Sequence, residues 1–143
     1  MIVSFEPWHL LAITPQPYQA GCIRTEQHAK NIAEVGAFTC LHDGIPVAAG
    51  GIVPAEKYGL VFSRGIGNAW MVIAEGITPY WPEIFRATRR ELRRGLARYH
   101  RIEANTTFPE GERMLEMLGM QCEGHLKKYS NNGGDASLWA ITR

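Results

Sequence analysis

The sequence has few cysteines, almost no net charge and no long apolar segment. Its three cysteines are Cys22, Cys40 and Cys122. They are an odd number without CxxC spacing, so they predict neither a disulfide framework nor a zinc site and suit a reducing compartment. We expect all three side chains to be buried in the protein as small hydrophobic residues. A formal net charge of +1 favours no class of partner. No apolar run approaches the roughly 20 residues that cross a bilayer, and residues 1–25 lack a basic start followed by an apolar block. These absences predict a protein without a membrane partner that is not secreted.

The remaining composition is ordinary for a globular protein, with 45% hydrophobic and 20% charged residues. This composition excludes wholesale disorder, collagen-like repeats and a coiled coil. The length of 143 residues suits one domain, and we find no internal repeat, linker or low-complexity tail. We therefore predict a single α/β domain over residues 1–143.

Hydrophobic periodicity and turn signals predict a strand, two helices, three strands, a helix, a strand, a helix and two strands. The Asp43-Gly44 pair between two apolar runs predicts a β-hairpin, and the apolar run from Ala69 to Ala74 is typical of a strand buried on both faces. The predicted elements are strand 2–6, helical turn 7–11, helix 25–35, strands 37–41, 46–53 and 69–74, helix 79–99, strand 101–106, helix 109–118, and strands 120–129 and 136–142.

The helix predicted at 79–99 is the longest element. Pro82 fits a helix only in its first turn, so the firm helix starts near this residue. Apolar and small side chains repeat at helical spacing and predict its buried stripe: Trp81, Phe85, Thr88, Leu92, Leu96 and Tyr99.

Residues 101–129 carry a recognisable pattern. A predicted strand precedes a helix that ends in Leu118-Gly119-Met120, and the next strand begins near Glu123-Gly124. This pattern resembles the C-terminal half of the GCN5-related N-acetyltransferase (GNAT) family, with Met120 in place of the usual phenylalanine. The upstream order of elements is similar too. The resemblance implies a GNAT-like fold with a mixed sheet, in which strands 69–74 and 101–106 run parallel and diverge at their C-terminal ends.

Three short segments resemble the small acetyltransferase-like proteins of tailed phages, including an internal virion protein. These segments are Phe5-Glu6-Pro7-Trp8-His9-Leu10, Gln16-Pro17-Tyr18-Gln19-Ala20 and Arg86-Ala87-Thr88-Arg89-Arg90. The resemblance implies a location in the host cytoplasm or the virion, with other virion or assembly proteins as partners.

Acetyl transfer requires backbone donors at two places: a splayed strand for the thioester and a turn before a helix for the pyrophosphate. The resemblance places the cofactor contacts at Val72, Ile73, Ala74, Ile77 and Thr78. The turn at 75–82 has one glycine, no basic residue and two prolines, which lack N–H groups. The sequence therefore predicts a degenerate acetyl-CoA site with a Kd no tighter than about 1 mM, or about −4 kcal/mol.

A second glycine-containing segment, Arg64-Gly65-Ile66-Gly67, could form an anion-binding turn. A strand rather than a helix is predicted after it, so we interpret it as a surface connection.

The residues for proton transfer are also incomplete. The family's asparagine and tyrosine fall at Phe108 and Leu115. Glu75, after the fourth strand, is the candidate base, although a carboxylate there is also typical of a solvated strand end. Tyr129 and His125, in the predicted sixth strand, suit packing and surface polarity.

Seven of the eleven arginines lie in residues 86–101. Those on the helix lie away from the apolar stripe and form either a solvated face or a surface for an acidic protein or nucleic acid, since guanidinium groups bind carboxylates and phosphates. The candidate partner-binding residues are Arg90, Arg93, Arg94 and Arg98.

The sequence thus favours a GNAT-like protein without catalysis that acts through its surface in a phage particle or its assembly. In this interpretation no cofactor and no metal are expected, and DNA is a weaker candidate partner than protein. The alternative is an acetyl-CoA-dependent N-acetyltransferase acting on a small amine or a protein amine. A third hypothesis is a regulatory module that binds acyl-CoA without turnover.

Overall fold

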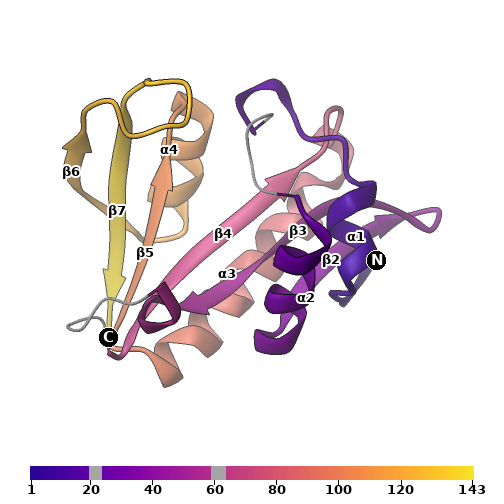
Figure 1. Cartoon of the computed structure of the whole chain (residues 1–143), viewed down its shortest axis with the longest axis horizontal. Helices are drawn as coiled ribbons and strands as arrows, with labels where there is room; N and C mark the ends of the chain where they lie inside the picture. The colour runs from indigo at the N-terminus through magenta and orange to yellow at the C-terminus, as the bar shows by residue number, and fades with distance from the viewer. Residues whose placement is uncertain (20–23, 59–63) are drawn as a thin grey trace. The chain divides into compact units, whose positions relative to one another are not determined.

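The computed structural model describes residues 1–19, 24–58 and 64–143 (Figure 1). Its strands form a mixed sheet in the order β1-β2-β3-β4-β5-β7-β6, and the order of helices and strands along the chain is the predicted one. The described elements are β1 (Ile2–Ser4), α1 (Pro7–Ala12), η1 (Pro17–Gln19), α2 (Glu26–Val35), β2 (Ala37–His42), β3 (Ile45–Pro54), η2 (Ala55–Tyr58), β4 (Ile66–Ile73), η3 (Thr78–Tyr80), α3 (Trp81–Arg98), β5 (Arg101–Thr106), α4 (Pro109–Met117), β6 (Gln121–Leu126) and β7 (Ala136–Thr142).

Several boundaries differ from the predicted ones for local reasons. The first strand ends before Glu6, because Glu6 is the N-cap of α1 and forms a capping box with His9. The fourth strand begins at Ile66 rather than Ala69, because its first residues pair with β5. The sixth strand ends at Leu126, and Lys128 adopts a positive φ of 52° in the turn that follows.

The chain divides into two compact units, and β4 and α3 each contribute residues to both. The first unit comprises Met1–Val53 and Trp70–Leu92, and the second comprises Pro54–Ala69 and Arg93–Arg143. The prediction of a single domain remains a prediction.

In the first unit, β1, β2 and β3 are antiparallel, and the β2–β3 hairpin turns at Asp43 and Gly44, which both have positive φ as predicted. Two apolar clusters form its core. One joins α1 and α2 to the strands: Phe5, Leu10, Ile13, Ala29, Ile32, Ala49 and Val72. The other joins α3 to the strands: Cys40, Ala48 and Ile84. Consistent with this, Figure 1 shows α1 and α2 in front of the strands of this unit and α3 behind them.

The buried stripe of α3 differs from the prediction. The most buried side chains are Ile84, Ala87 and Leu92, whereas Trp81 and Phe85 are only half-buried. The strands present Cys40 and Ala48 to this helix, and these small residues leave room for a close approach rather than for two large rings. The aromatic residues therefore lie at the margin of the helix interface, where their rings contact each other at 6.2 Å between centroids. Pro82 lies in the first turn, as predicted.

In the second unit, β7 lies between β5 and β6 and is antiparallel to both. Its core joins α4 to these strands through Ala104, Met120 and Trp139, with Leu115 packed against them. Helix α4 ends before Gly119, whose φ of 90° confirms the predicted glycine stop. Met120 therefore packs as the core residue after that glycine.

The cysteine prediction is partly wrong. Cys40 is fully buried, as expected, but Cys122 is exposed. Cys122 lies on β6, the last strand in the sheet order, where Gln121 and Glu123 are exposed as well. An edge strand has one fewer neighbour to cover it, so hydrophobic character alone did not place this thiol inside. Cys22 lies outside the described residues.

Candidate functional site

The pairing between β4 and β5 is parallel, as predicted, and short. Three residue pairs join them, Ile66–Arg101, Gly67–Ile102 and Asn68–Glu103. In the described register this pairing stops at Asn68 and Glu103, although β4 continues to Ile73 and β5 to Thr106. The carboxyl-terminal half of β4 therefore takes no strand partner from β5.

The end of β4 lies in the first unit and has two distinct edges. The N–H of Ala74 donates to the Val47 carbonyl oxygen of β3 at 2.8 Å. Because backbone polar groups alternate along a strand, those of Met71 and Ile73 point to the opposite edge. At that edge Ile73 is hydrogen-bonded to Gln16 and Gln19, and Met71 is hydrogen-bonded to Gln19. Both glutamines precede α2 in the chain. The predicted contact residues Val72 and Ile73 are buried, and Ala74 is half-buried.

The turn after β4 carries the other predicted contact residues. Gly76 has a φ of 72°, and a Cβ added there would meet nothing within 4 Å. The N–H groups of Gly76, Ile77 and Thr78 make no hydrogen bond to any described residue. Pro79 lies in η3 and has no N–H, so three consecutive backbone donors remain before it. Residues 72–78 thus form the end of β4 and the turn that leads into η3, and their contact with a cofactor stays a prediction.

Glu75 lies at the start of this turn and is exposed. Its carboxylate has no ion pair or hydrogen bond with the described residues. No contact with the described residues therefore gives this carboxylate a structural role.

The segment at Arg64–Gly67 forms a turn into a strand. Gly65 has a φ of 78°, and its carbonyl accepts the N–H of His100 at 3.0 Å. A Cβ at Gly65 would lie 2.5 Å from Nδ1 of His100. The segment leads into β4 rather than a helix, which confirms its interpretation as a connection.

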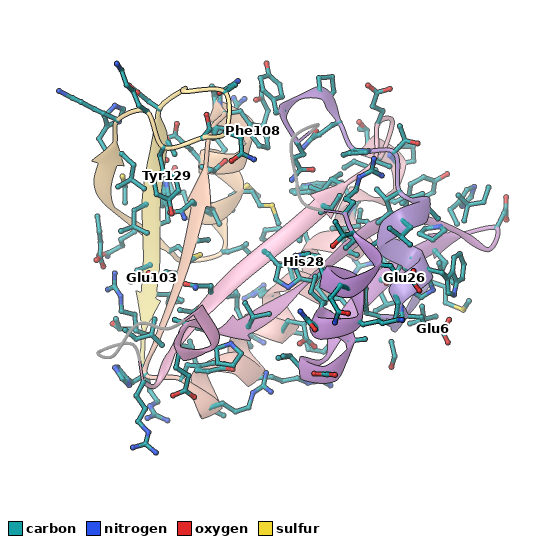
Figure 2. All side chains as sticks on the ribbon, in the orientation of Figure 1. Glu6, Glu26, His28, Glu103, Phe108 and Tyr129 are labelled. Carbon is teal, nitrogen blue, oxygen red and sulfur yellow. The ribbon has the colours of Figure 1, made fainter. Side chains whose placement is uncertain are left out.

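The second unit holds the positions where the resemblance expects polar catalytic groups. Phe108 is the N-cap of α4 and gives no side-chain cap, and Leu115 packs into the core of this unit. Figure 2 shows Phe108 and Tyr129 toward the carboxyl end of β5, whereas Glu103 lies nearer the amino end of the strand. The Asn105 amide donates to the Tyr129 hydroxyl at 3.3 Å. No sequence pattern indicated this pair, because only the fold brings residues 24 positions apart into contact.

His125 and Asp135 tie the connection between β6 and β7. The His125 Nε2 and Asp135 Oδ2 atoms are 3.1 Å apart, and the backbone N–H of Lys128 donates to Asp135 Oδ1 at 3.0 Å. The Lys128 N–H and then the imidazole lower the pKa of Asp135 below its usual value. These contacts give His125 a structural partner.

The arginines of residues 86–101 have two different environments. Arg101, on β5, is largely buried and donates to Glu103 at 2.8 Å and to both carboxylate oxygens of Glu123 at 3.0 and 2.7 Å. The Glu123 and Glu103 carboxylates raise the pKa of Arg101. The arginines on α3 are exposed: Arg86, Arg89, Arg90, Arg93, Arg94 and Arg98. Only the helical arginines therefore offer a cationic face.

Among the residues that the structure describes, no group of three or more His, Cys, Asp or Glu side chains is placed to hold a metal ion. Within the same ranges, no helix combines the length and the apolar character needed to span a membrane.

No protein-family model and no curated protein matches the sequence. Solved structures do match in fold. A GNAT-family acetyltransferase from Streptococcus pneumoniae is similar over 100% of this chain and 99% of its own, with a TM-score of 0.73 and 12% identity. A GNAT-superfamily phosphinothricin acetyltransferase from Sinorhizobium meliloti, in complex with AcCoA, is similar over 99% of this chain and 87% of its own, with a TM-score of 0.77 and 12% identity. A GNAT-family acetyltransferase from Bacillus anthracis is similar over 99% and 93%, with a TM-score of 0.63 and 21% identity.

These similarities confirm the predicted fold class. The chain has the mixed α/β fold of GNAT acetyltransferases, with seven strands in the described sheet. At such identities the similarity shows the fold and leaves activity, acceptor and partner to be proposed from the site.

Proposed function

We propose that this protein binds an acyl-coenzyme A along the end of β4 and the turn at 75–78, and that it transfers the acyl group to an amine. The observation that carries the proposal is the edge of β4 at Met71 and Ile73. In the described register it takes no partner from β5, and it is hydrogen-bonded instead to the backbone N–H of Gln16 and to the side-chain amide of Gln19. An edge that accepts one planar amide has the geometry to accept another, and the pantetheine arm of coenzyme A contains two.

The residues present suit the pantetheine arm of such a ligand better than its phosphates. At the strand, Met71 and Ile73 supply an N–H donor and carbonyl acceptors, which match an amide completely. At the turn, Gly76, Ile77 and Thr78 would offer a phosphate three N–H groups that make no hydrogen bond to the described residues, with no basic side chain in the turn. The weak phosphate end agrees with the predicted Kd no tighter than about 1 mM. The fold neighbour solved with AcCoA supports the choice of ligand.

Acyl-coenzyme A would supply the thioester carbonyl as the electrophile. The exposed Glu75 carboxylate accepts the proton that an ammonium acceptor must lose before it can attack. Phe108 and Leu115 offer no acid, so the thiolate that leaves would take its proton from water, because a free thiol is mostly protonated at neutral pH. The chain thus contributes positioning and one base, which predicts slow turnover.

Titration of uniformly labelled protein with acetyl-CoA, followed by amide NMR, tests the binding. We expect the signals of Ile73, Gly76, Ile77 and Thr78 to shift with a midpoint near 1 mM or above. Pantetheine alone should shift Ile73, and ADP alone should shift the turn. An unchanged spectrum at about 5 mM acetyl-CoA would exclude the proposal.

Thiol release from acetyl-CoA in the presence of polyamines or lysine peptides tests transfer. Glu75→Gln should lower this rate about 100-fold at neutral pH without changing the NMR midpoint. Equal rates in the two proteins would remove Glu75 from the mechanism.

A second candidate function is the non-catalytic surface role in a phage particle. The exposed arginines of α3 favour it, because they exceed what solubility requires on one helix.

A further inference from the structure

Residues 15–19, which we call the edge segment, lie along the edge of β4 that faces away from β3. Pro15 forms an isolated antiparallel bridge with Ala74. The N–H of Gln16 donates to the Ile73 carbonyl oxygen at 2.9 Å. The segment then turns into η1, which ends at Gln19. All of these residues belong to the first unit.

The Gln19 side chain completes the contact. Its Nε2 donates to the Met71 carbonyl oxygen at 2.8 Å, and its Oε1 accepts the N–H of Ile73 at 2.9 Å. The orientation of this amide is fixed, because a carbonyl oxygen needs a donor and an N–H needs an acceptor. One amide that bonds to residues i and i+2 of a strand acts as a neighbouring strand would.

We propose that Gln19 is an internal competitor for acyl-coenzyme A: its amide holds the place of a pantetheine amide, and the ligand binds β4 only after Gln19 has left. This inference rests on the proposed function. Gln16 and Gln19 hydrogen-bond to the Met71 carbonyl and to the N–H and carbonyl groups of Ile73. Without these contacts the three backbone groups would be available to the ligand. A ligand amide therefore exchanges one set of hydrogen bonds for an equal set and gains little from them.

The size of the effect follows from the two bonds that Gln19 makes. Each typical hydrogen bond contributes a net factor of roughly three to ten to an equilibrium constant. Removing the competitor should thus strengthen acyl-coenzyme A binding by about tenfold to a hundredfold. If Gln19 instead helped to hold the ligand, its removal would weaken acyl-coenzyme A binding.

The direct test is the Kd of acetyl-CoA for the wild type, Gln19→Ala and a matched control. Gln27→Ala serves as the control, because Gln27 is an exposed glutamine of α2 whose amide bonds only to Asn31 of the same helix among the described residues. We expect Gln19→Ala to tighten the Kd at least tenfold and Gln27→Ala to leave it unchanged. A Kd that is unchanged or weaker in Gln19→Ala, while the wild type binds, would refute the competition and leave the proposed function intact.

A second measurement uses the wild type, so it does not depend on the variant folding. Saturation with pantetheine should move the side-chain NH₂ signals of Gln19 to the positions of a solvated amide, while the Ile73 N–H stays protected from hydrogen exchange. Gln19 signals that stay in place while the Ile73 signal shifts would show that ligand and Gln19 bind together, which contradicts competition. If neither acetyl-CoA nor pantetheine binds wild type or Gln19→Ala at about 5 mM, the proposed function fails and this inference fails with it.

Discussion

His9 is buried in the first unit, and its Nδ1 atom faces two donors. The backbone N–H of Glu6 lies 3.0 Å from Nδ1, and the Thr39 hydroxyl lies 2.8 Å from it. Nδ1 must therefore be an unprotonated acceptor, which leaves the proton of the neutral ring on Nε2. Burial lowers the pKa of His9, and the Glu6 carboxylate opposes this shift only in part.

This environment predicts a pH dependence of stability. Between the lowered folded pKa and the unfolded value near 6.5, the unfolded chain binds a proton that the folded chain does not. The contribution of His9 is therefore complete above about pH 6.5 and is lost as the pH falls through that window. Urea unfolding from pH 8 to pH 5 should show this loss in the wild type and in His42→Gln, whose histidine is exposed, but not in His9→Gln.

An NMR titration of the His9 ring supports the same test in the wild type. Its midpoint should lie below that of an ordinary histidine. A midpoint at or above 6.5 would show that burial does not lower the pKa of His9.

Gly111 shows how closely helix α4 approaches β5. A Cβ added at this position would lie 2.0 Å from Oγ1 of the buried Thr106 and 3.1 Å from its Cβ. Alanine normally stabilises a helix relative to glycine by about 1 kcal/mol. Here we expect Gly111→Ala to destabilise the protein by about 1–3 kcal/mol, because the helix must move away from the strand.

Chemical denaturation of Gly111→Ala, Thr106→Ala and the double variant measures this contact. Removing the Thr106 hydroxyl should recover part of the loss, which appears as a coupling energy of at least about 0.5 kcal/mol. Gly124→Ala is the control, since a Cβ there meets nothing within 4 Å. A stabilised Gly111→Ala protein would mean that the helix and the strand are farther apart.

The exposed arginines of α3 all lie on this one helix, so their role can be tested by substitutions in α3. Changing Arg90, Arg93 and Arg94 together to Glu should leave the fold nearly intact, since exposed substitutions move stability by less than about 0.5 kcal/mol each. We expect the triple variant to lose incorporation into phage particles if the surface role holds. Circular dichroism and urea unfolding check the fold, and particle composition checks the role.

The matched control makes the same charge change at scattered basic residues. Lys30 on α2, Arg113 on α4 and Lys127 in the turn after β6 are exposed and can be changed together to Glu. Normal incorporation of both folded variants would show that the α3 face is only solvated. Loss in both would indicate a dependence on net charge rather than on this helix.

At the scale of the whole molecule, two elements pass from one unit to the other. Strand β4 crosses between Ala69 and Trp70, and α3 crosses between Leu92 and Arg93. Unfolding one unit would break the backbone hydrogen bonds of an element that the other unit also contains. We therefore predict one cooperative unfolding transition.

Fluorine NMR of protein labelled with 5-fluorotryptophan measures the units separately. Trp8, Trp70 and Trp81 report on the first unit and Trp139 on the second. All four signals should lose their native intensity at the same urea concentration. A separate midpoint for Trp139 would establish two domains and correct the single-domain prediction.

Local patterns in the sequence determined the order of elements. The Asp43-Gly44 hairpin and the end of the helix at Gly119 depend on backbone conformations that neighbouring residues impose, and both agree with the structure. The strand end and turn at residues 72–78 were predictable as well, whereas their contact with a cofactor stays a prediction. Conversely, the apolar residues at Phe108 and Leu115 already indicated that an acid would be missing there.

Only the tertiary structure decided what each strand edge and helix face meets. Trp81 and Phe85 fit the helical period of α3, yet Ile84 and Ala87 occupy the buried position because Cys40 and Ala48 permit close packing. Cys122 is exposed because β6 is the last strand in the sheet order. Gln19 reaches a strand more than 50 residues away, and no local periodicity records such a contact. Periodicity reflects interactions within a few residues, whereas these three outcomes depend on which distant segments the fold brings together.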